Sequence, residues 1–544
     1  MQDRVVVIGA GMGGLATTLR LAAAGVPVRL IETQPYPGGK LRTVASAAGP
    51  VDAGPTVLTM RHVFDDLFAA AGTSLDEHVT LVREPLLARH FWLDGSQLDL
   101  WDDPERSAEA VRAWGGAAAA ADFRAFSARA KRLYEGLDGP MMQAARPTLA
   151  GLAAHMLRHP RMIADMGTGT LAAALRSQVR EPRLRQLFGR YATYVGGAPD
   201  RSPAVLGLIW HAEASGVWRV AGGMHRLAQA LATLAERLGA EIDYGTPAAE
   251  LMVARGRVTG VRTQNGAHIP AGHVVFAGDP RALARGHLGA TGKRALPKQA
   301  TEPRSLSAHV LAFAAAVHGP DLAHHNVFFA DAPEAEFGPI ARGRLPEDPT
   351  VYVCAEDRGG TAAPAPGSPE RFETIVNAPA TGDRPDRPEE IQACLTRTLT
   401  RLAQSGLAFS PAPTTADLTT QRGFEALFPG SAGALYGRSP HGLMAAFARP
   451  TARTRIAGLI LAGGGAHPGA GVPMATLSGR HAVAAIMQDR TSISMSPKTG
   501  TPGGMSTASP TTAHKPSPSS PSSAPSSRPG TAGPAAATPP TTAA

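Results

Sequence analysis

Three glycines near the start of the chain have a spacing that can bind phosphate. Gly9, Gly11 and Gly14 form the pattern G-x-G-x-x-G, directly after the apolar run Val5–Ile8. The first glycine permits a tight turn, the second lets a pyrophosphate approach the backbone, and the third lets the following helix pack closely. Free N–H groups and the positive end of the helix dipole then face the phosphates. The pattern therefore predicts a strand, a turn and a helix that together bind a dinucleotide.

An acidic residue limits which dinucleotide fits this turn. A second apolar run, Val28–Ile31, ends in Glu32, at the distance from the glycines where a carboxylate can hydrogen-bond a ribose hydroxyl. A carboxylate at this place repels a 2′-phosphate, which makes NADP a poor ligand. Strand, turn, helix, strand and terminal acid together are a stronger signal than the glycines alone. These residues do not decide whether the bound dinucleotide is NAD or FAD.

A second glycine-rich turn could serve the same ligand. Gly463, Gly464 and Gly471 lie between a predicted strand at 459–462 and a predicted helix at 474–487. The start of that helix would place N–H groups and a positive dipole end beside negative charge on the ligand. The other residues that we expect to contact the dinucleotide are Gly13, Gly39, Lys40, Arg42, Gly54, Pro55, Thr56, Ala248, Val472, Pro473 and Met474.

The elements between the two turns indicate an α/β protein. Residues 59–190 have a mostly helical pattern, rich in Ala and Arg. A helix at 224–238 and strands at 217–220, 240–245, 257–263 and 274–278 follow it. A mixed α+β pattern then covers 286–430, with strands at 310–317, 326–330, 350–354 and 372–377 and a helix at 391–402.

This order divides the chain into interleaved regions. We expect a nucleotide-binding domain from 1–80, 221–285 and 431–490, a helical or substrate region at 81–220, and a substrate domain at 286–430. From Thr491 onward the sequence has no Leu, Val, Phe, Tyr, Trp, Asp or Glu. Such a composition cannot bury enough apolar surface to offset its ordering entropy, so 491–544 is predicted to be a disordered tail.

Composition excludes several classes of protein. The 544 residues carry a net charge of +9 but no recognisable nucleic-acid motif, so we expect no nucleic-acid partner. The two cysteines, Cys354 and Cys394, form no C-x-x-C motif, which argues against a disulfide framework or a zinc site and predicts no metal. Because a strand is predicted almost from Met1, we expect no signal peptide. No apolar run approaches the about 18 residues of a membrane span.

One segment has the composition of a membrane-surface helix. Residues 141–163 combine Met, Leu and Ala with Arg146, Arg158 and Arg161. An apolar face edged by cations is typical of an interfacial helix. It is equally typical of a core helix with a solvated polar face. The sequence leaves these two interpretations open.

The motifs occur in an order that resembles a known family. PGGK at 37–40, VDAGPTV at 51–57, GGM at 222–224 and GGGAHPGAGVPMATLSGR at 463–480 are similar to the flavin-dependent carotenoid desaturases of the phytoene-desaturase type, within the amine-oxidase-like flavoproteins. Further stretches resemble the hydroxyneurosporene and methoxyneurosporene desaturases. They include LIWHAEASGVWRVAGGM at 208–224, HHNVFF at 324–329 and YVCAEDRG at 352–359.

The resemblance implies a fold, a cofactor and a substrate. The fold is a Rossmann-like FAD-binding domain built from separated segments, with an inserted α+β substrate domain and a helical membrane-facing subdomain. FAD is expected to be non-covalent, because Cys394 precedes the second glycine-rich turn. The implied reaction is C-3,4 dehydrogenation of an acyclic 1-hydroxy or 1-methoxy carotenoid. We expect a cytoplasmic protein at the inner membrane, in contact with its carotenoid and with other enzymes of that pathway.

The proton acceptor is less well defined by the sequence. Glu213, His211 and His225 lie beside the GVWRVAGG block and are the candidates, although each also fits a structural hydrogen bond. The flavin or solvent could take the proton instead. Three other functions stay open: another carotenoid desaturase of the phytoene type, a flavin oxidase of amines or porphyrinogens, and a non-enzymatic lipid-escort protein of related fold.

Overall fold

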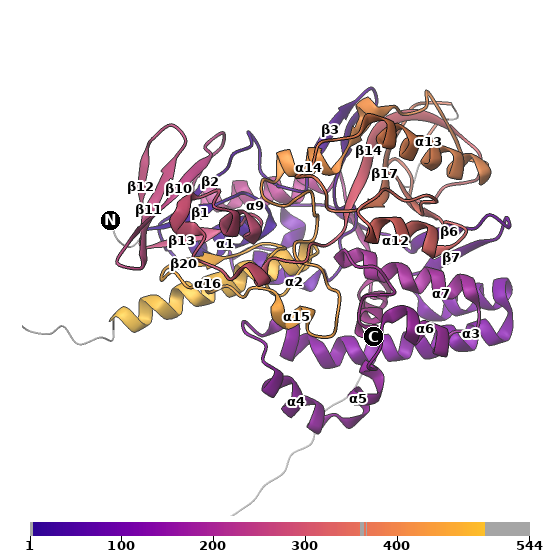
Figure 1. Ribbon diagram of the computed structural model, residues 1–544, viewed down its shortest axis with the longest axis horizontal. Coiled ribbons are helices and arrows are strands. Elements are labelled where there is room, and N and C mark those ends of the chain that lie inside the picture. The colour runs from indigo at the N-terminus through magenta and orange to yellow at the C-terminus, as the bar shows by residue number, and fades with distance from the viewer. Residues whose placement is uncertain (1–3, 360–363, 366, 495–544) are drawn as a thin grey trace, which may run out of the picture. The chain divides into compact units, whose positions relative to one another are not determined.

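The computed structural model describes residues 4–359, 364–365 and 367–494 (Figure 1). The last helix, α16 (Val472–Ser494), includes residues 491–494, which the sequence analysis assigned to the disordered tail. The predicted start of the tail was therefore wrong by one helical turn. The rest of the predicted tail lies outside the described residues.

A five-stranded parallel sheet carries the N-terminal glycine-rich turn. Its strand order is β20-β13-β1-β2-β9, so segments from the start, middle and end of the chain lie side by side. The alternating residues of β1 are buried on both faces, which explains why it reads as a continuous apolar run. The strands are β1 (Val5–Ile8), β2 (Val28–Ile31), β9 (Glu241–Asp243), β13 (His273–Phe276) and β20 (Leu459–Leu461).

Helices cover one face of this sheet and a small antiparallel sheet covers the other. Helix α1 (Met12–Ala23) packs against α16 and α9 (His225–Arg237). The opposite face packs against β10 (Ala248–Ala254) and β11 (Arg257–Thr263), which β12 (His268–Pro270) extends. The expected nucleotide-binding fold, assembled from separated segments, is therefore present.

An eight-stranded sheet forms the second layer of the protein. Its order is β18-β14-β17-β16-β15-β6-β7, with β19 paired to β14. Two of its strands, β6 and β7, fall in the stretch that we expected to be mostly helical, and the sequence analysis missed them. They form a hairpin in which Arg89 and Asp99 are directly paired. Nε of Arg89 lies 2.9 Å from Oδ1 of Asp99. The strands are β6 (Leu86–Phe91), β7 (Gln97–Trp101), β14 (Ser307–His318), β15 (His325–Phe328), β16 (Val351–Ala355), β17 (Glu370–Ala378), β18 (Ala408–Ser410) and β19 (Leu418–Thr419).

The two faces of this larger sheet have different neighbours. Helix α13 (Pro388–Gln404) covers one face through Cys394, Leu395 and Leu402. Val327, Phe329 and Tyr352 on the other face pack against the helical region. That region contains α3 (Pro104–Leu137), η2 (Asp138–Gln143), α4 (Leu149–Arg158), α5 (Pro160–Met166), α6 (Leu171–Gln178), α7 (Pro182–Gly189), η3 (Arg190–Val195), η4 (Ala204–Leu208) and α8 (Ile209–Ala214).

Short elements connect these layers. The strands are β3 (Thr43–Ser46), β4 (Gly49–Asp52), β5 (Leu81–Arg83) and β8 (Trp218–Val220). The helices are α2 (His62–Ala69), α10 (Pro280–Arg285), α11 (Gly289–Gly292), α12 (Pro333–Ala341), α14 (Gln421–Leu427) and α15 (Ala445–Ala448). Single 3₁₀ turns occur at η1 (Leu75–Glu77), η5 (Lys298–Ala300) and η6 (Thr415–Asp417).

Candidate functional site

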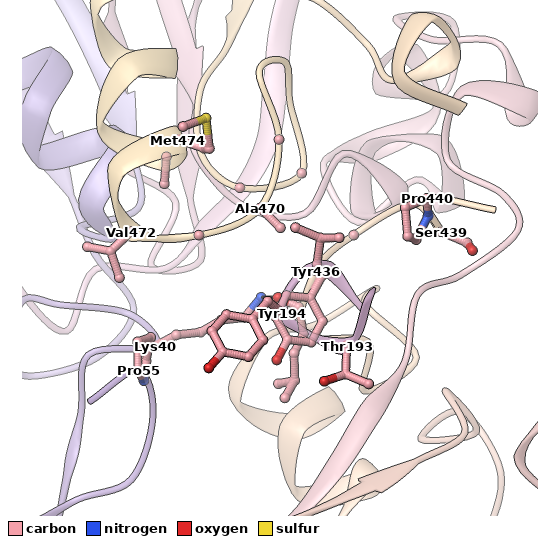
Figure 2. Close-up of a pocket in the computed structure, with 18 of the residues that line it drawn as sticks. Lys40, Pro55, Thr193, Tyr194, Tyr436, Ser439, Pro440, Ala470, Val472 and Met474 are labelled. Atoms are coloured by element: carbon pink, nitrogen blue, oxygen red, sulfur yellow. Dashed lines mark hydrogen bonds between the residues drawn. The ribbon is translucent and has the colours of Figure 1, made fainter. Parts of the chain in front are cut away.

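A cavity of about 1560 Å³ extends from the glycine-rich turns to the larger sheet and the helical region. Sites for one drug-sized ligand are usually about 300–1,000 Å³, so this cavity has room for more than one such molecule. Figure 2 shows residues that line it from several parts of the chain, among them Lys40, Tyr194, Tyr436 and Met474. Two sheets and a set of helices thus form one site.

The N-terminal turn has an open cradle at Gly11. A Cβ atom added at Gly11 would meet no other atom of the described residues within 4 Å, and Gly11 borders the cavity. A Cβ at Gly13 would collide with the backbone of Gly463, and one at Gly14 with the carbonyl of Gly9. Gly11 therefore leaves space for a ligand, whereas Gly13 and Gly14 permit close packing. Gly14 is the one predicted contact residue that does not border the cavity.

Glu32 borders the cavity at the end of β2, as the sequence predicts for a ribose-binding carboxylate. Its Oε2 accepts a hydrogen bond from the N–H of Ala10 at 2.6 Å, and its Oε1 accepts one from Gln34 at 2.8 Å. These bonds fix the carboxylate beside the first turn.

The second glycine-rich turn meets the first one. The start of α16 lies at the cavity, and Pro473 is the second residue of this helix rather than the first. Gly479 allows α16 to pack on α1, since a Cβ there would lie 2.9 Å from the Cβ of Ala16. Both turns therefore present backbone to the same space. Gly9, Gly39, Arg42, Gly54, Pro55, Thr56, Ala248, Gly463, Gly464, Gly471, Val472 and Met474 also border it.

Two cations, the half-buried Lys40 and the buried Arg449, face the cavity without a carboxylate partner. Lys40 donates to the carbonyl of Leu435, and burial lowers the pKa of Lys40 to about 8. Arg449 donates to the carbonyls of Tyr436, Gly464 and Arg438, and burial lowers its pKa to about 10. Within the described chain, neither forms an ion pair with an acidic side chain. Because a buried charge without a counter-charge is unfavourable, this wall fits an anionic ligand.

The three candidate proton acceptors do not border the cavity. Glu213 is buried behind it and accepts hydrogen bonds from the hydroxyls of Tyr191 and Tyr194, the latter at 3.0 Å. Burial raises the pKa of Glu213, and these hydrogen bonds oppose the shift. Tyr194 does border the cavity, so Glu213 can act on a ligand only through this tyrosine.

The two candidate histidines lie in other environments. His211 packs edge-on against Tyr134, with ring centroids 5.2 Å apart, and burial lowers its pKa. His225 lies beside Asp52, with Nδ1 and Oδ1 3.3 Å apart. The structure therefore does not bring the three candidates together.

Sequence reasoning missed a polar wall on the larger sheet. Glu373 and Asn377 lie on the same face of β17 and border the cavity together with Glu336. Asn377 donates to Glu336 at 2.8 Å, and burial raises the pKa of Glu336 to about 7. Neither oxygen of Glu373 has a hydrogen-bond partner in the described structure. No local sequence signal marked Glu336 or Glu373, because each has other charged or polar residues close to it in the sequence.

Much of the remaining lining is apolar and comes mainly from the helical region. It continues from the polar wall past η2 and η4 to the segment before α15. Its apolar residues include Trp92, Leu137, Met141, Met142, Leu175, Val205, Leu206, Leu208, Ile209, Phe329 and Leu443. A long apolar molecule could occupy this part while an anionic group occupies the glycine-lined end.

Comparison with known proteins agrees with this arrangement. The model of the family described as flavin containing amine oxidoreductase matches residues 12–487. Hydroxyneurosporene desaturase of Cereibacter sphaeroides is 56% identical over 487 residues, covering 89% of this chain and 98% of the relative. The protein of the same name from Rhodobacter capsulatus is 52% identical over 489 residues, covering 90% and 98%.

A solved structure shows the same fold at lower similarity. Cyclohexylamine oxidase from Brevibacterium oxydans superposes with a TM-score of 0.52 at 16% identity, covering 90% of this chain and 100% of that one. Together with the family match over most of the described chain, the expected amine-oxidase-like flavoprotein fold is confirmed. This chain belongs to the family of flavin-containing amine oxidoreductases.

Proposed function

We propose that this protein is an FAD-dependent carotenoid desaturase that introduces the C-3,4 double bond into acyclic 1-hydroxy or 1-methoxy carotenoids of the neurosporene type. The observation that carries this proposal is one continuous cavity that joins a dinucleotide cradle to a long apolar lining. Two relatives at 56% and 52% identity are named hydroxyneurosporene desaturase. A small amine would not need an apolar lining of this extent.

The residues of the glycine-lined end fit FAD. The open space at Gly11 would accept the pyrophosphate, and Glu32 would bind a ribose hydroxyl. Lys40, Arg449 and the start of α16 offer positive charge to the anionic parts of the cofactor. Neither cysteine borders the cavity, which supports non-covalent binding. When bound, the flavin supplies the hydride acceptor, since no side chain can be one.

A buried pair of side chains could remove the proton from the carbon next to the hydride donor. Tyr194 borders the cavity, accepts a hydrogen bond from Arg190 at 3.1 Å and donates one to Glu213. A proton from the substrate would go to the Tyr194 oxygen while the hydroxyl proton of Tyr194 passes to the Glu213 carboxylate. The raised pKa of Glu213 makes this carboxylate a better acceptor.

The polar wall gives the cavity a means to distinguish carotenoids by their end group. The hydroxyl at C1 is only a few bonds from the reacting C3 and C4, so it must lie close to the reacting part of the site. Asn377 and Glu336 border the cavity and can donate and accept hydrogen bonds there. A site built to bond a hydroxyl discriminates strongly against an analogue that lacks it.

Exposed apolar side chains surround one end of the lining and suit a membrane surface. Leu157, Leu149 and Ile163 of α4 and α5 are 78%, 55% and 51% exposed, and Leu443 is 57% exposed. Phe447 packs into the cluster under α4 and α5, which places α15 beside these helices. Figure 1 shows α4 and α5 projecting beyond α3. No helix in the described ranges is both long and apolar enough to span a bilayer.

This surface could accept the carotenoid directly from lipid. Leu443 belongs both to the exposed patch and to the cavity lining, and Met141 of the lining packs into the same cluster as Phe447. Arg146, Arg158 and Arg161 are exposed in the same segment and could contact anionic headgroups. Peripheral contact with the inner membrane from the cytoplasmic side is therefore part of the proposal.

The deciding experiment is a turnover assay with defined pigments. Purified flavoprotein is mixed with liposomes that contain 1-hydroxyneurosporene, and the products are separated by chromatography. We expect a product two hydrogens lighter, with an absorption spectrum shifted to longer wavelength by one more conjugated bond. Neurosporene without the hydroxyl is the control and should react more slowly. Oxidation of simple amines with no reaction of either carotenoid would refute the proposal.

A further inference from the structure

Three side chains with metal-binding atoms meet where β15 and β16 pair. A ring nitrogen of His324, a ring nitrogen of His325 and Sγ of Cys354 all lie within 4.8 Å of one another. The two histidines are each 3% exposed, and Cys354 is fully buried. None of the three borders the cavity. This cluster therefore needs an explanation of its own.

The hydrogen bonds of the two imidazoles leave one nitrogen of each ring available. Nδ1 of His324 lies 3.0 Å from the carbonyl of Arg358, so Nδ1 carries the proton and Nε2 keeps its lone pair. Nδ1 of His325 lies 2.7 Å from the hydroxyl of Tyr352, and its buried Nε2 has no partner in the described structure. In metal-binding histidines, one ring nitrogen binds the metal and the other is usually hydrogen-bonded to a neighbouring protein group, as Nδ1 is in both residues here.

The distance between sulfur and nitrogen suits a shared ion. Sγ of Cys354 and Nε2 of His324 are 3.6 Å apart. A tetrahedral zinc ion with bonds of about 2.3 Å to sulfur and about 2.0 Å to nitrogen holds those two atoms about 3.6 Å apart. The same distance also allows a weak hydrogen bond from the thiol to the imidazole, which the ion would replace. The cluster therefore has the spacing of a metal site without any rearrangement of these two residues.

The strand register adds a carboxylate to this group. His325 is paired with Cys354 on the neighbouring strand, and Cys354 is paired with Glu373 on the next one. The three side chains thus form a row on one face of the sheet. Directly paired residues have Cβ atoms about 4.5–5.5 Å apart, so a change of rotamer could bring Glu373 to the same ion. Both oxygens of Glu373 lack a partner in the described structure and are free to bind.

We propose that His324, His325 and Cys354 bind one zinc-type divalent ion in the interior of the larger sheet, with Glu373 within reach as the fourth ligand. Two imidazoles, a thiolate and a carboxylate are a ligand set that zinc accepts in tetrahedral geometry. The ion would hold the His325 ring, and through it the hydroxyl of Tyr352, which is 2.9 Å from Thr56 Oγ1 at the cavity wall. The site would then stiffen the wall that faces the substrate.

The test is metal analysis of the flavin-loaded, full-length protein after incubation with zinc and removal of loosely bound metal. We expect one zinc per chain, and zinc-edge X-ray absorption should show one sulfur neighbour among nitrogen and oxygen neighbours. This measurement does not depend on turnover, and the flavin does not interfere with it.

A matched pair of variants assigns the sulfur. The chain has only two cysteines, and Cys394 packs on the opposite face of the same sheet. Cys354→Ser should lower the affinity for zinc by at least about tenfold, whereas Cys394→Ser should leave it unchanged. The flavin content of both variants shows whether they are folded. Absence of stoichiometric zinc in the parent protein, or a metal environment without sulfur, would overturn the proposal even if Cys354→Ser does not fold.

Discussion

The buried carboxyl of Glu336 makes stability depend on pH in a way that one substitution can reveal. Glu336 is 2% exposed, and burial raises its pKa to about 7, against hydrogen bonds from Asn377 and Thr350 that lower it. The ordinary pKa of a Glu side chain, which the unfolded chain retains, is 4.5. The folded protein thus holds this proton more tightly than the unfolded chain does. The contribution of Glu336 to stability is therefore present at low pH and is lost as pH rises through about 7.

Glu336→Gln replaces the protonated acid by a neutral group of similar shape. A pKa difference of about 2.5 units corresponds to about 3 kcal/mol, at 1.36 kcal/mol per unit. At about pH 8.5 the variant should be more stable than the parent by up to this amount, whereas at about pH 5 the difference should be small. The benefit arises because the variant no longer has to ionise a buried group.

Urea unfolding of the flavin-loaded protein at several pH values measures this effect. The matched control is Glu334→Gln, which lies on the same helix α12 but at an exposed position. The control should follow the parent at every pH. If Glu336→Gln also follows the parent between about pH 5 and pH 8.5, the carboxyl is not buried in a neutral form and the argument fails.

Other substitutions test other parts of the site. Gly11→Val should abolish flavin retention without changing the circular dichroism of the apoprotein, because a Cβ there meets no other atom of the described residues within 4 Å; full flavin content would place the phosphate site elsewhere. Lys40→Met should raise the unfolding temperature of the apoprotein and weaken FAD binding, since it removes a half-buried cation whose pKa is lowered to about 8; an unchanged FAD affinity by titration would contradict the assigned role. Glu213→Gln should slow turnover while flavin content stays normal, and Tyr194→Phe should have the same effect; normal kcat in both would exclude the proton path. Replacing Arg146, Arg158 and Arg161 by Glu should weaken sedimentation with anionic liposomes, by about 1 kcal/mol for each lost cation, and leave neutral liposomes unaffected; unchanged binding would move the docking surface elsewhere.

The local part of the site could be predicted from the sequence because its signals are local. Motifs of only a few residues indicate the roles of three parts of the site. They are the turn at Gly9–Gly14, the acid Glu32 and the turn before α16. The strands β6 and β7 were missed because their hairpin interrupts a long helical pattern. Arg449 and Glu373 were missed because only tertiary packing brings them to the cavity.

The candidate proton acceptors and the proposed metal site show the same limit of sequence-based prediction. Glu213 is close in sequence to the GVWRVAGG block, yet Tyr194 stands between it and the cavity. His325 and Cys354 meet only because β15 pairs with β16 in one particular register. Sequence spacing identifies ligands that share a turn or a helix face. It does not identify those that come from different strands.

The order of strands in the nucleotide-binding sheet has a consequence for how the protein is made. β1 is paired with β13, and β13 with β20, so the sheet is complete only after residue 461 has been synthesised. Until then one edge of β13 stays unpaired, and the side of α1 that packs on α16 stays uncovered. Contacts so distant in sequence form slowly, and uncovered strand edges favour aggregation. We therefore expect newly made chains to depend on chaperones and to acquire FAD only after β20 has joined the sheet.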